Sequence, residues 1–250
     1  MHARHALIEA HVLLSRIGPA SIHACQMKYY SVILRRTKHS TKAKPMGYDF
    51  DKTHESILES AARHFLDAGF AGASIRQICR DAGVTNGAFY AHFESKDDLF
   101  ASLVEPTLEG LNNLYGAEAS RFREIHSTDD VLEALDLAFS ADEAIIRYIY
   151  DHAEAFNLLL KASGGTSYEQ LPDSIAETEK ENTLAFFELC KPFVNKPENI
   201  SGSIAAQAST FIVKTVFDCL LSGKSESEAI REAQLASEFC LAGLKQIWGI

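Results

Sequence analysis

The stretch RDAGVTNGAFYAHFESKDDLF, residues 80–100, decides the fold of this chain. Two runs with helical spacing flank Gly83, a residue that permits a tight turn. At about 100° per residue, Phe89 and Phe93 fall on one side of the second helix, toward a core. The opposite side carries small residues such as Gly87 and almost no long polar side chain. The stretch therefore predicts two short helices joined by a tight turn, with one bare face.

The residues before this stretch complete a small helical domain. An apolar stripe of helical period precedes Gly69, which is suited to a positive φ at the helix end. The stripe consists of Ile57, Leu58, Ala61, Ala62, Phe65 and Leu66. Ser74 and Gln77 then have the spacing of a capping box that starts the next helix, and Thr85 can cap the helix after it. Two helices joined by a glycine turn form a helix-turn-helix, whose second helix enters the DNA major groove.

The bare face of the second helix suits close approach to base edges in a groove about 12 Å wide. We expect Ala88 or Ala91 to contact a thymine methyl, Asn86 to reach a base edge or a phosphate, and polar side chains nearby to hold phosphate oxygens. The candidate DNA-binding residues are Ser74, Arg76, Thr85, Asn86, Gly87, Ala88, Tyr90, Ala91, His92 and Lys96. Taken singly, an aromatic or His residue here is more often structural; together with the capped helix pair, these residues indicate DNA contact.

The segment SIRQICRDAGVTNGAFYAHFESKDDLF, residues 74–100, resembles the DNA-binding signature of the TetR (tetracycline-repressor-like) transcriptional regulators, and the resemblance runs over residues 51–103. It departs from the family pattern at Cys79, Asn86 and Ala88, which leaves the operator sequence open. The resemblance implies an all-α fold in which an N-terminal three-helix helix-turn-helix domain precedes a larger helical domain for ligand binding and dimerisation. It also implies a homodimeric repressor that a ligand releases from a palindromic operator.

Charge and composition suggest three regions. Residues 1–48 hold eight Lys or Arg and one acidic residue, within a chain of net charge −10. We interpret them as a disordered extension, with Met46 as an alternative start, or else as a basic arm that touches a phosphate backbone. Residues 49–100 form the predicted DNA-binding domain, and residues 101–250 form the predicted second domain.

The second domain reads as helices over residues 128–139, 142–161, 168–190, 200–222 and 225–248, the last opened by a capping box at Ser225 and Glu228. By the resemblance, the last two helices form a dimer interface. Its expected residues are Ala208, Phe211, Ile212, Thr215, Ala236, Phe239 and Cys240. The resemblance also implies a ligand pocket, although aromatic residues at helical spacing more often belong to a core. Its candidate lining residues are Phe139, Tyr148, His152, Phe156, Phe186 and Phe187.

Several classes of protein are disfavoured. The longest apolar run, residues 204–221, contains Gln207, Lys214 and Asp218 and does not suit a membrane span. Five scattered cysteines without a CxxC pair disfavour a disulfide framework and a zinc site, and fit a reducing cytoplasm. No nucleophile–base pair or metal cluster has a recognisable spacing, so we expect neither enzyme activity nor a cofactor. The predicted partners are double-stranded DNA, a small-molecule effector and a second copy of the chain. A helical adaptor or an enzyme domain fused to a helix-turn-helix is the alternative.

Overall fold

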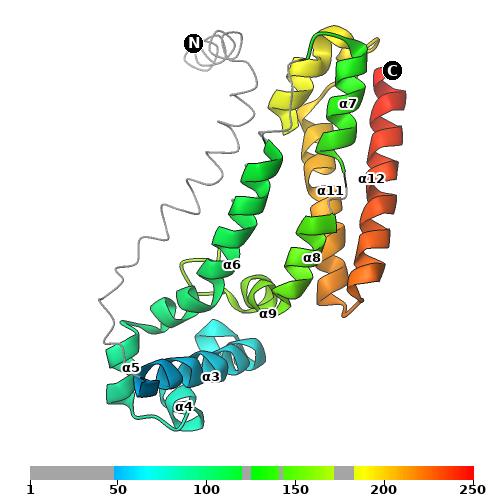
Figure 1. The fold of residues 1–250 in the computed structure, drawn as a ribbon. Coiled ribbons are helices and arrows are strands. Elements are labelled where there is room, and N and C mark those ends of the chain that lie inside the picture. The colour runs from blue at the N-terminus through cyan, green and yellow to red at the C-terminus, as the bar shows by residue number, and fades with distance from the viewer. Residues whose placement is uncertain (1–47, 120–124, 141–142, 172–182) are drawn as a thin grey trace, which may run out of the picture. The chain divides into compact units, whose positions relative to one another are not determined.

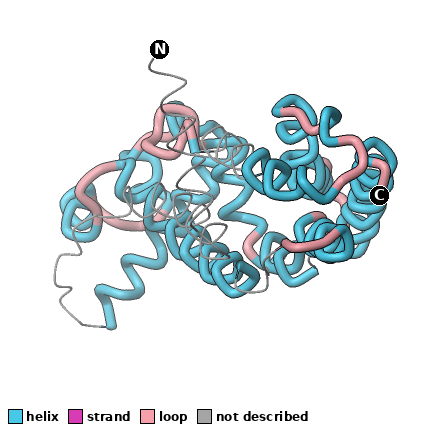
Figure 2. Tube along the Cα trace, turned by 90° about the horizontal axis from the view of Figure 1, so that it is seen from above, coloured by secondary structure: helices cyan, strands magenta, loops and turns pink. Residues whose placement is uncertain are grey.

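The computed structural model describes residues 48–119, 125–140, 143–171 and 183–250, so the predicted basic extension lies almost wholly outside the described residues. Within these ranges the chain forms helices and connecting loops, with no strand (Figure 2). The described residues fall into two compact units. The first, here the reading unit, contains residues 48–112 and 147–171; the second, here the bundle unit, contains the others. Residues 147–171 group with the N-terminal helices in this division, and the expected domain boundary after residue 100 stays a prediction.

The reading unit combines one 25-residue helix with several shorter helical elements (Figure 1). Its elements are α3 (Tyr48–Gly72), α4 (Ile75–Asp81), α5 (Asn86–His92), the first part of α6 (Lys96–Ala119), the end of α8 (Glu143–Asp151), α9 (Ala153–Asn157) and the π-helix η1 (Leu158–Ala162). Its core includes Ile57, Ala61, Phe65, Ile78, Phe89, Phe93, Leu99, Phe100 and Val104, each at most 2% exposed. Each apolar face predicted from residues 57–100 therefore points inward, except that Leu66 is 37% exposed.

Two glycines make the turns of this unit. Gly69 has a φ of 69° and a ψ of 166°, so its positive φ agrees with the prediction but its ψ lies outside the left-handed helical region. Gly83 has a φ of 70°. Its N–H donates to the Arg80 carbonyl at 3.1 Å, and the Val84 N–H donates to the Cys79 carbonyl at 2.9 Å. These two bonds form a Schellman motif, which ends α4 and turns the chain into α5.

The predicted helix caps form in two of three places. The Thr85 hydroxyl accepts from the Ala88 N–H at 3.1 Å, and the capping box between Ser225 and Glu228 is complete. The capping box predicted at Ser74 is wrong, because the Ser74 side chain makes no capping hydrogen bond. Its carbonyl accepts from the N–H of Gln77 at 3.0 Å instead, which satisfies that donor through the backbone.

The bundle unit packs long helices around a tryptophan. Its elements are the end of α6, α7 (Thr128–Ala138), the start of α8, a helical run over residues 183–190, the 3₁₀ turns η2 (Lys191–Phe193) and η3 (Pro197–Asn199), α11 (Gly202–Leu221) and α12 (Glu226–Trp248). The α11 and α12 helices lie side by side (Figure 1). Trp248 is fully buried, and its ring meets the Phe187 ring edge-on at 4.7 Å. The Lys245 ammonium forms a salt bridge of 2.8 Å with the Asp136 carboxylate of α7.

Two predicted helices differ from the structure. The helix expected over residues 142–161 breaks at His152, whose φ of −114° and ψ of 31° leave the helical region; α9 and η1 follow as separate short elements. In the helix expected over residues 168–190, residues 168–170 form a turn, residues 183–190 are helical, and residues 172–182 lie outside the described residues. The helices predicted at residues 128–139, 200–222 and 225–248 are confirmed as α7, α11 and α12.

Candidate nucleic-acid interface

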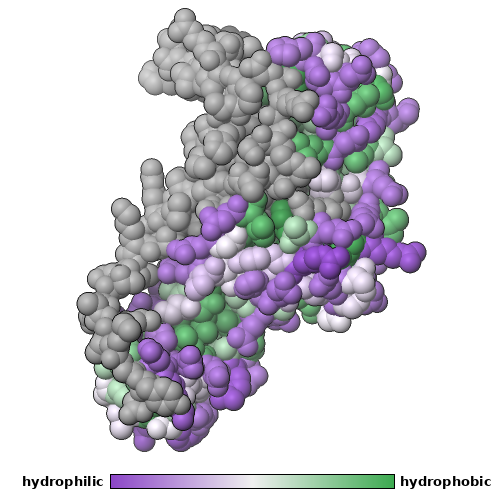
Figure 3. Space-filling view, in the orientation of Figure 1, coloured by the Kyte–Doolittle hydropathy of each residue, from purple (hydrophilic) through white to green (hydrophobic). Residues whose placement is uncertain are grey.

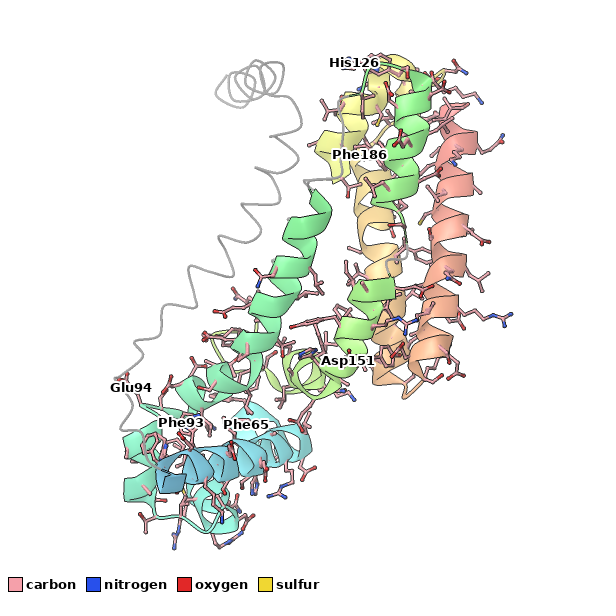
Figure 4. All side chains as sticks on the ribbon, in the orientation of Figure 1. Phe65, Phe93, Glu94, His126, Asp151 and Phe186 are labelled. Carbon is pink, nitrogen blue, oxygen red and sulfur yellow. The ribbon has the colours of Figure 1, made fainter. Side chains whose placement is uncertain are left out.

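The α5 helix is anchored on one side and bare on the other. Phe89 is fully buried and Phe93, just after the helix, is 2% exposed. On the opposite side Gly87 and Ala91 are exposed, and Tyr90 is 56% exposed. Because no other part of the reading unit covers this side, it is free to contact a partner. Phe93 and Phe65, both labelled in Figure 4, are two buried rings of the unit.

Gly87 is not required by the protein's own fold. A Cβ built at Gly87 meets only the Thr85 hydroxyl, at 3.7 Å, which is ordinary van der Waals contact. The residue has no positive φ, so an L side chain is not strained there. Glycine nevertheless weakens a helix relative to alanine. The protein's own fold therefore does not explain the absence of a side chain at this position.

The N-terminal end of α5 and the neighbouring α4 supply polar groups around this bare side. Thr85 and Asn86 are exposed at the start of α5, and Arg76 is exposed on α4. Ser74 and Ala88 are half-buried. The predicted contact residues therefore lie on two neighbouring helices, α4 and α5, of the reading unit. Their contacts with DNA stay predictions.

Lys96 has partners inside the protein. Its ammonium donates to the carbonyls of Phe70 at 2.6 Å and Ala73 at 2.9 Å, and it lies 4.4 Å from the centre of the Phe70 ring. Burial lowers the pKa of this ammonium. The structure therefore gives Lys96 the role of tying the start of α6 to the end of α3, a role that the sequence did not suggest; its predicted phosphate contact stays untested.

His92 packs against the first turns of α3. Its ring stacks on Phe50 with ring centres 3.9 Å apart, and His54 stacks on Phe93 at 4.7 Å. These rings fix the C-terminal end of α5 against α3. The His92 side chain is half-buried, and its predicted phosphate contact is likewise untested.

A polar contact joins α3 to α4 on the surface. His64 Nε2 lies 2.8 Å from the Asp81 carboxylate, and Arg80 Nε donates to the other carboxylate oxygen at 3.0 Å. The hydrogen bonds from Arg80 and His64 lower the pKa of Asp81. Inside the unit, the buried Ser60 hydroxyl donates to the Ile78 carbonyl at 3.0 Å. Together these contacts set the position of α4 relative to α3.

The residues expected at a dimer interface differ in how much of each side chain is exposed. Ala208 and Ala236 are buried between the helices, and Ile212, Thr215 and Cys240 are half-buried. Phe211 is 41% exposed and Phe239 is 73% exposed, and their ring centres lie 5.7 Å apart. Leu235, which the sequence did not single out, is 52% exposed. Hydrophobic atoms reach the surface among hydrophilic ones along the side that carries α12 (Figure 3).

The six expected pocket residues fall in different units. Phe139, Phe186 and Phe187 belong to the core of the bundle unit, where the Ser237 hydroxyl also donates to the Phe139 carbonyl. Figure 4 marks Phe186. In the reading unit, the Tyr148 and His152 rings stack at 4.0 Å, and Phe156 is 3% exposed. Each set packs within its own unit, so the structure describes core contacts for these side chains, and a lining role stays a prediction.

Sequence reasoning missed the contacts between α6 and residues 147–171. Gly110 of α6 lies against the Tyr148 side chain, and Glu105 of α6 accepts a hydrogen bond from the Tyr168 hydroxyl. The available signal was a glycine and a proline inside a run that otherwise reads as a helix, residues 96–119. Among the described residues, no group of His, Cys, Asp and Glu side chains suits a metal ion, and no described helix is long and apolar enough to cross a membrane.

In comparison with known proteins, residues 57–103 match the family model of bacterial regulatory proteins, tetR family. The HTH-type transcriptional regulator AcrR of Shigella flexneri is 38% identical over 63 residues, which are 25% of this chain and 29% of AcrR. The uncharacterized HTH-type transcriptional regulator YerO of Bacillus subtilis (strain 168) is 29% identical over 116 residues, 38% of this chain and 40% of YerO. The chain thus matches less than half the length of either relative.

Two solved structures are also similar. A transcriptional regulator (TerR/AcrR family) from Aquifex aeolicus VF5 is 22% identical, with a TM-score of 0.44 over 78% of this chain and 99% of that chain. The structure of a SmeT-triclosan complex is 20% identical, with a TM-score of 0.47 over 76% of this chain and 90% of that chain.

Proposed function

We propose, from the premise that this chain belongs to the tetR family of bacterial regulatory proteins, that it is a transcriptional regulator that binds a palindromic DNA operator as a homodimer. The α5 helix enters the major groove and reads base edges with its bare side. Residues around it, on α4 and at the start of α5, contact phosphates and set the register.

The observation that carries this proposal is the division of α5 into a buried side and a bare side. Phe89 holds the helix to the core, while Gly87 has room for a side chain that the sequence does not use. A solvated helix face normally carries long charged residues. A helix that lies in a DNA groove benefits from small residues, because they let its backbone approach the base edges.

The exposed aromatic surface of α11 and α12 supports a dimer. Phe239, Leu235 and Phe211 expose large apolar side chains on neighbouring helices, an arrangement typical of a protein interface. A two-fold pairing through this surface buries them against their symmetry mates. Such a dimer presents two α5 helices about 34–36 Å apart, one turn of DNA, and therefore selects a palindrome.

A small apolar or amphipathic effector releases the protein from DNA in this proposal, which makes it a repressor. The effector binds the second domain and favours an arrangement of α6 in which the reading helices no longer match the operator. To weaken DNA binding 100-fold, it must prefer the released form by about 2.7 kcal/mol.

The test is selection of a binding sequence from a random pool of DNA duplexes, followed by fluorescence anisotropy with the selected duplex. We expect a palindrome to be enriched, and Tyr90→Ala to weaken its binding while the melting temperature stays the same. Tyr90→Phe keeps the ring and removes only the hydroxyl, so it separates phosphate contact from packing. Selection without a consensus, or full binding by Tyr90→Ala, contradicts the proposed reading surface.

A further inference from the structure

The α6 helix carries a glycine where another side chain presses against the backbone. A Cβ built at Gly110 would lie 2.9 Å from Tyr148 Cζ and closer still to the Tyr148 hydroxyl, so any larger residue forces the tyrosine away. Real Cβ atoms essentially never approach a neighbour so closely. Glycine in a helix interior is unfavourable. Unlike Gly87, Gly110 therefore has a reason inside the protein, which is to seat Tyr148.

Tyr148 is held in this seat from two sides. Its hydroxyl donates to the Thr107 carbonyl of α6 at 2.9 Å, and its ring stacks on His152 with centres 4.0 Å apart. Burial raises the pKa of the Tyr148 hydroxyl, which therefore stays protonated as a donor. The contact thus combines close packing of Tyr148 on Gly110 with one hydrogen bond, in which the tyrosine is the donor.

Residues 147–171 make two further hydrogen bonds to α6. The Tyr168 hydroxyl donates to Glu105 at 2.5 Å, and the Ser167 N–H donates to Asp97 at 2.9 Å. Pro106 lies between the contacts at Glu105 and Gly110 and removes one backbone donor from α6, which weakens the helix at that point. Contacts from residues 147–171 therefore bracket the weakest part of α6.

We propose that Tyr148, seated on Gly110, is a positioning residue that fixes α6 and through it the DNA-reading helix. This inference rests on the proposed function. Lys96, the first residue of α6, hydrogen-bonds to carbonyls at the end of α3. A displacement of α6 therefore moves the DNA-reading helix α5 with it. A loosened α6 must be ordered again when DNA binds, and this cost lowers the affinity.

The experiment measures affinity for the selected duplex and thermal unfolding for Gly110→Ala, Tyr148→Ala and the double variant. Gly164→Ala is the matched control, because it adds the same methyl group at an exposed position of the same unit where nothing lies within 4 Å. We expect each single variant to bind about tenfold more weakly, a typical size for coupling between sites. The double variant should bind no more weakly than the worse single variant, because both changes remove one contact. Gly164→Ala should bind like the wild type.

Tyr148→Phe covers the case in which Gly110→Ala does not fold. It keeps the ring and loses only the bond to the Thr107 carbonyl, and we expect a smaller loss of affinity in a folded protein. Lowered melting temperatures with unchanged affinity would show that the contact only stabilises the fold and would overturn the proposal, as would additive losses in the double variant. A wild-type protein that selects no duplex refutes the proposed function, and the positioning role that rests on it falls with it.

Discussion

Replacing Gly87 with alanine separates what the fold needs from what DNA binding needs. The added methyl group meets only the Thr85 hydroxyl at 3.7 Å, so it causes no clash in the free protein. Alanine is favoured over glycine in helices by up to about 1 kcal/mol. Since Gly87 lies in the first turn of α5, we expect a gain in stability below that limit. For a chain of this size, 1 kcal/mol corresponds to a rise of about 2–4 °C in melting temperature.

The same methyl group should weaken DNA binding. If α5 lies flush against base edges, the methyl group enters a packed contact, and an added methylene in such a contact costs about 1–3 kcal/mol. This corresponds to roughly a 5- to 150-fold loss of affinity. Gly87→Ala is thus expected to be a more stable protein that binds its operator less well.

The assay pairs differential scanning fluorimetry with anisotropy titration of the selected duplex at fixed ionic strength. Gly164→Ala again serves as the control for an added methyl group in open space. Wild-type affinity in Gly87→Ala would refute the idea that the bare side of α5 lies against DNA. A melting temperature several degrees below that of the wild type would refute the argument that the fold does not need this glycine.

Three further variants test other parts of the structure. Phe239→Ser should convert a dimer to a monomer in analytical ultracentrifugation, whereas the exposed Glu238→Ser, on another side of α12, should not; a dimeric Phe239→Ser protein would place the interface elsewhere. Thr85→Ala removes the cap of α5 and should cost about 1 kcal/mol in urea unfolding, and an unchanged midpoint would contradict the role of that hydroxyl. Hydrogen bonds from Ser225 lower the pKa of Glu228 from its ordinary 4.5, so its contribution to stability is present above that pH and disappears as the pH falls through the lowered pKa. Glu228→Gln should therefore melt below the wild type at pH 7 and approach it in acid, and a pH-independent difference would exclude this linkage.

The sequence was most informative where local chemistry determines the backbone. Gly83, Thr85 and the Ser225 capping box act through bonds within a few residues, and all three form as predicted. The apolar spacing that buries Phe89 and Phe93 is equally local. The Ser74 capping box failed because a backbone carbonyl took the place of the side chain, and sequence spacing does not distinguish these two acceptors.

The contacts that escaped prediction join residues far apart in the chain. Lys96 reaches carbonyls 26 and 23 residues earlier, and Tyr148 contacts a carbonyl 41 residues earlier. Nothing in the local pattern around Lys96 shows that its ammonium turns inward. Gly110 was visible in the sequence as a glycine inside a helix, but its reason became clear only when the fold placed Tyr148 above it.

The seven-residue length of α5 has a consequence for how new specificities arise. A helix so short is not stable by itself and depends on Phe89 for its attachment to the protein. The side chains turned outward, by contrast, contribute little to holding it in place. Mutations at Asn86 or Ala91 can therefore accumulate without unfolding the chain, and a gene duplicate can drift toward a different operator while the scaffold stays intact.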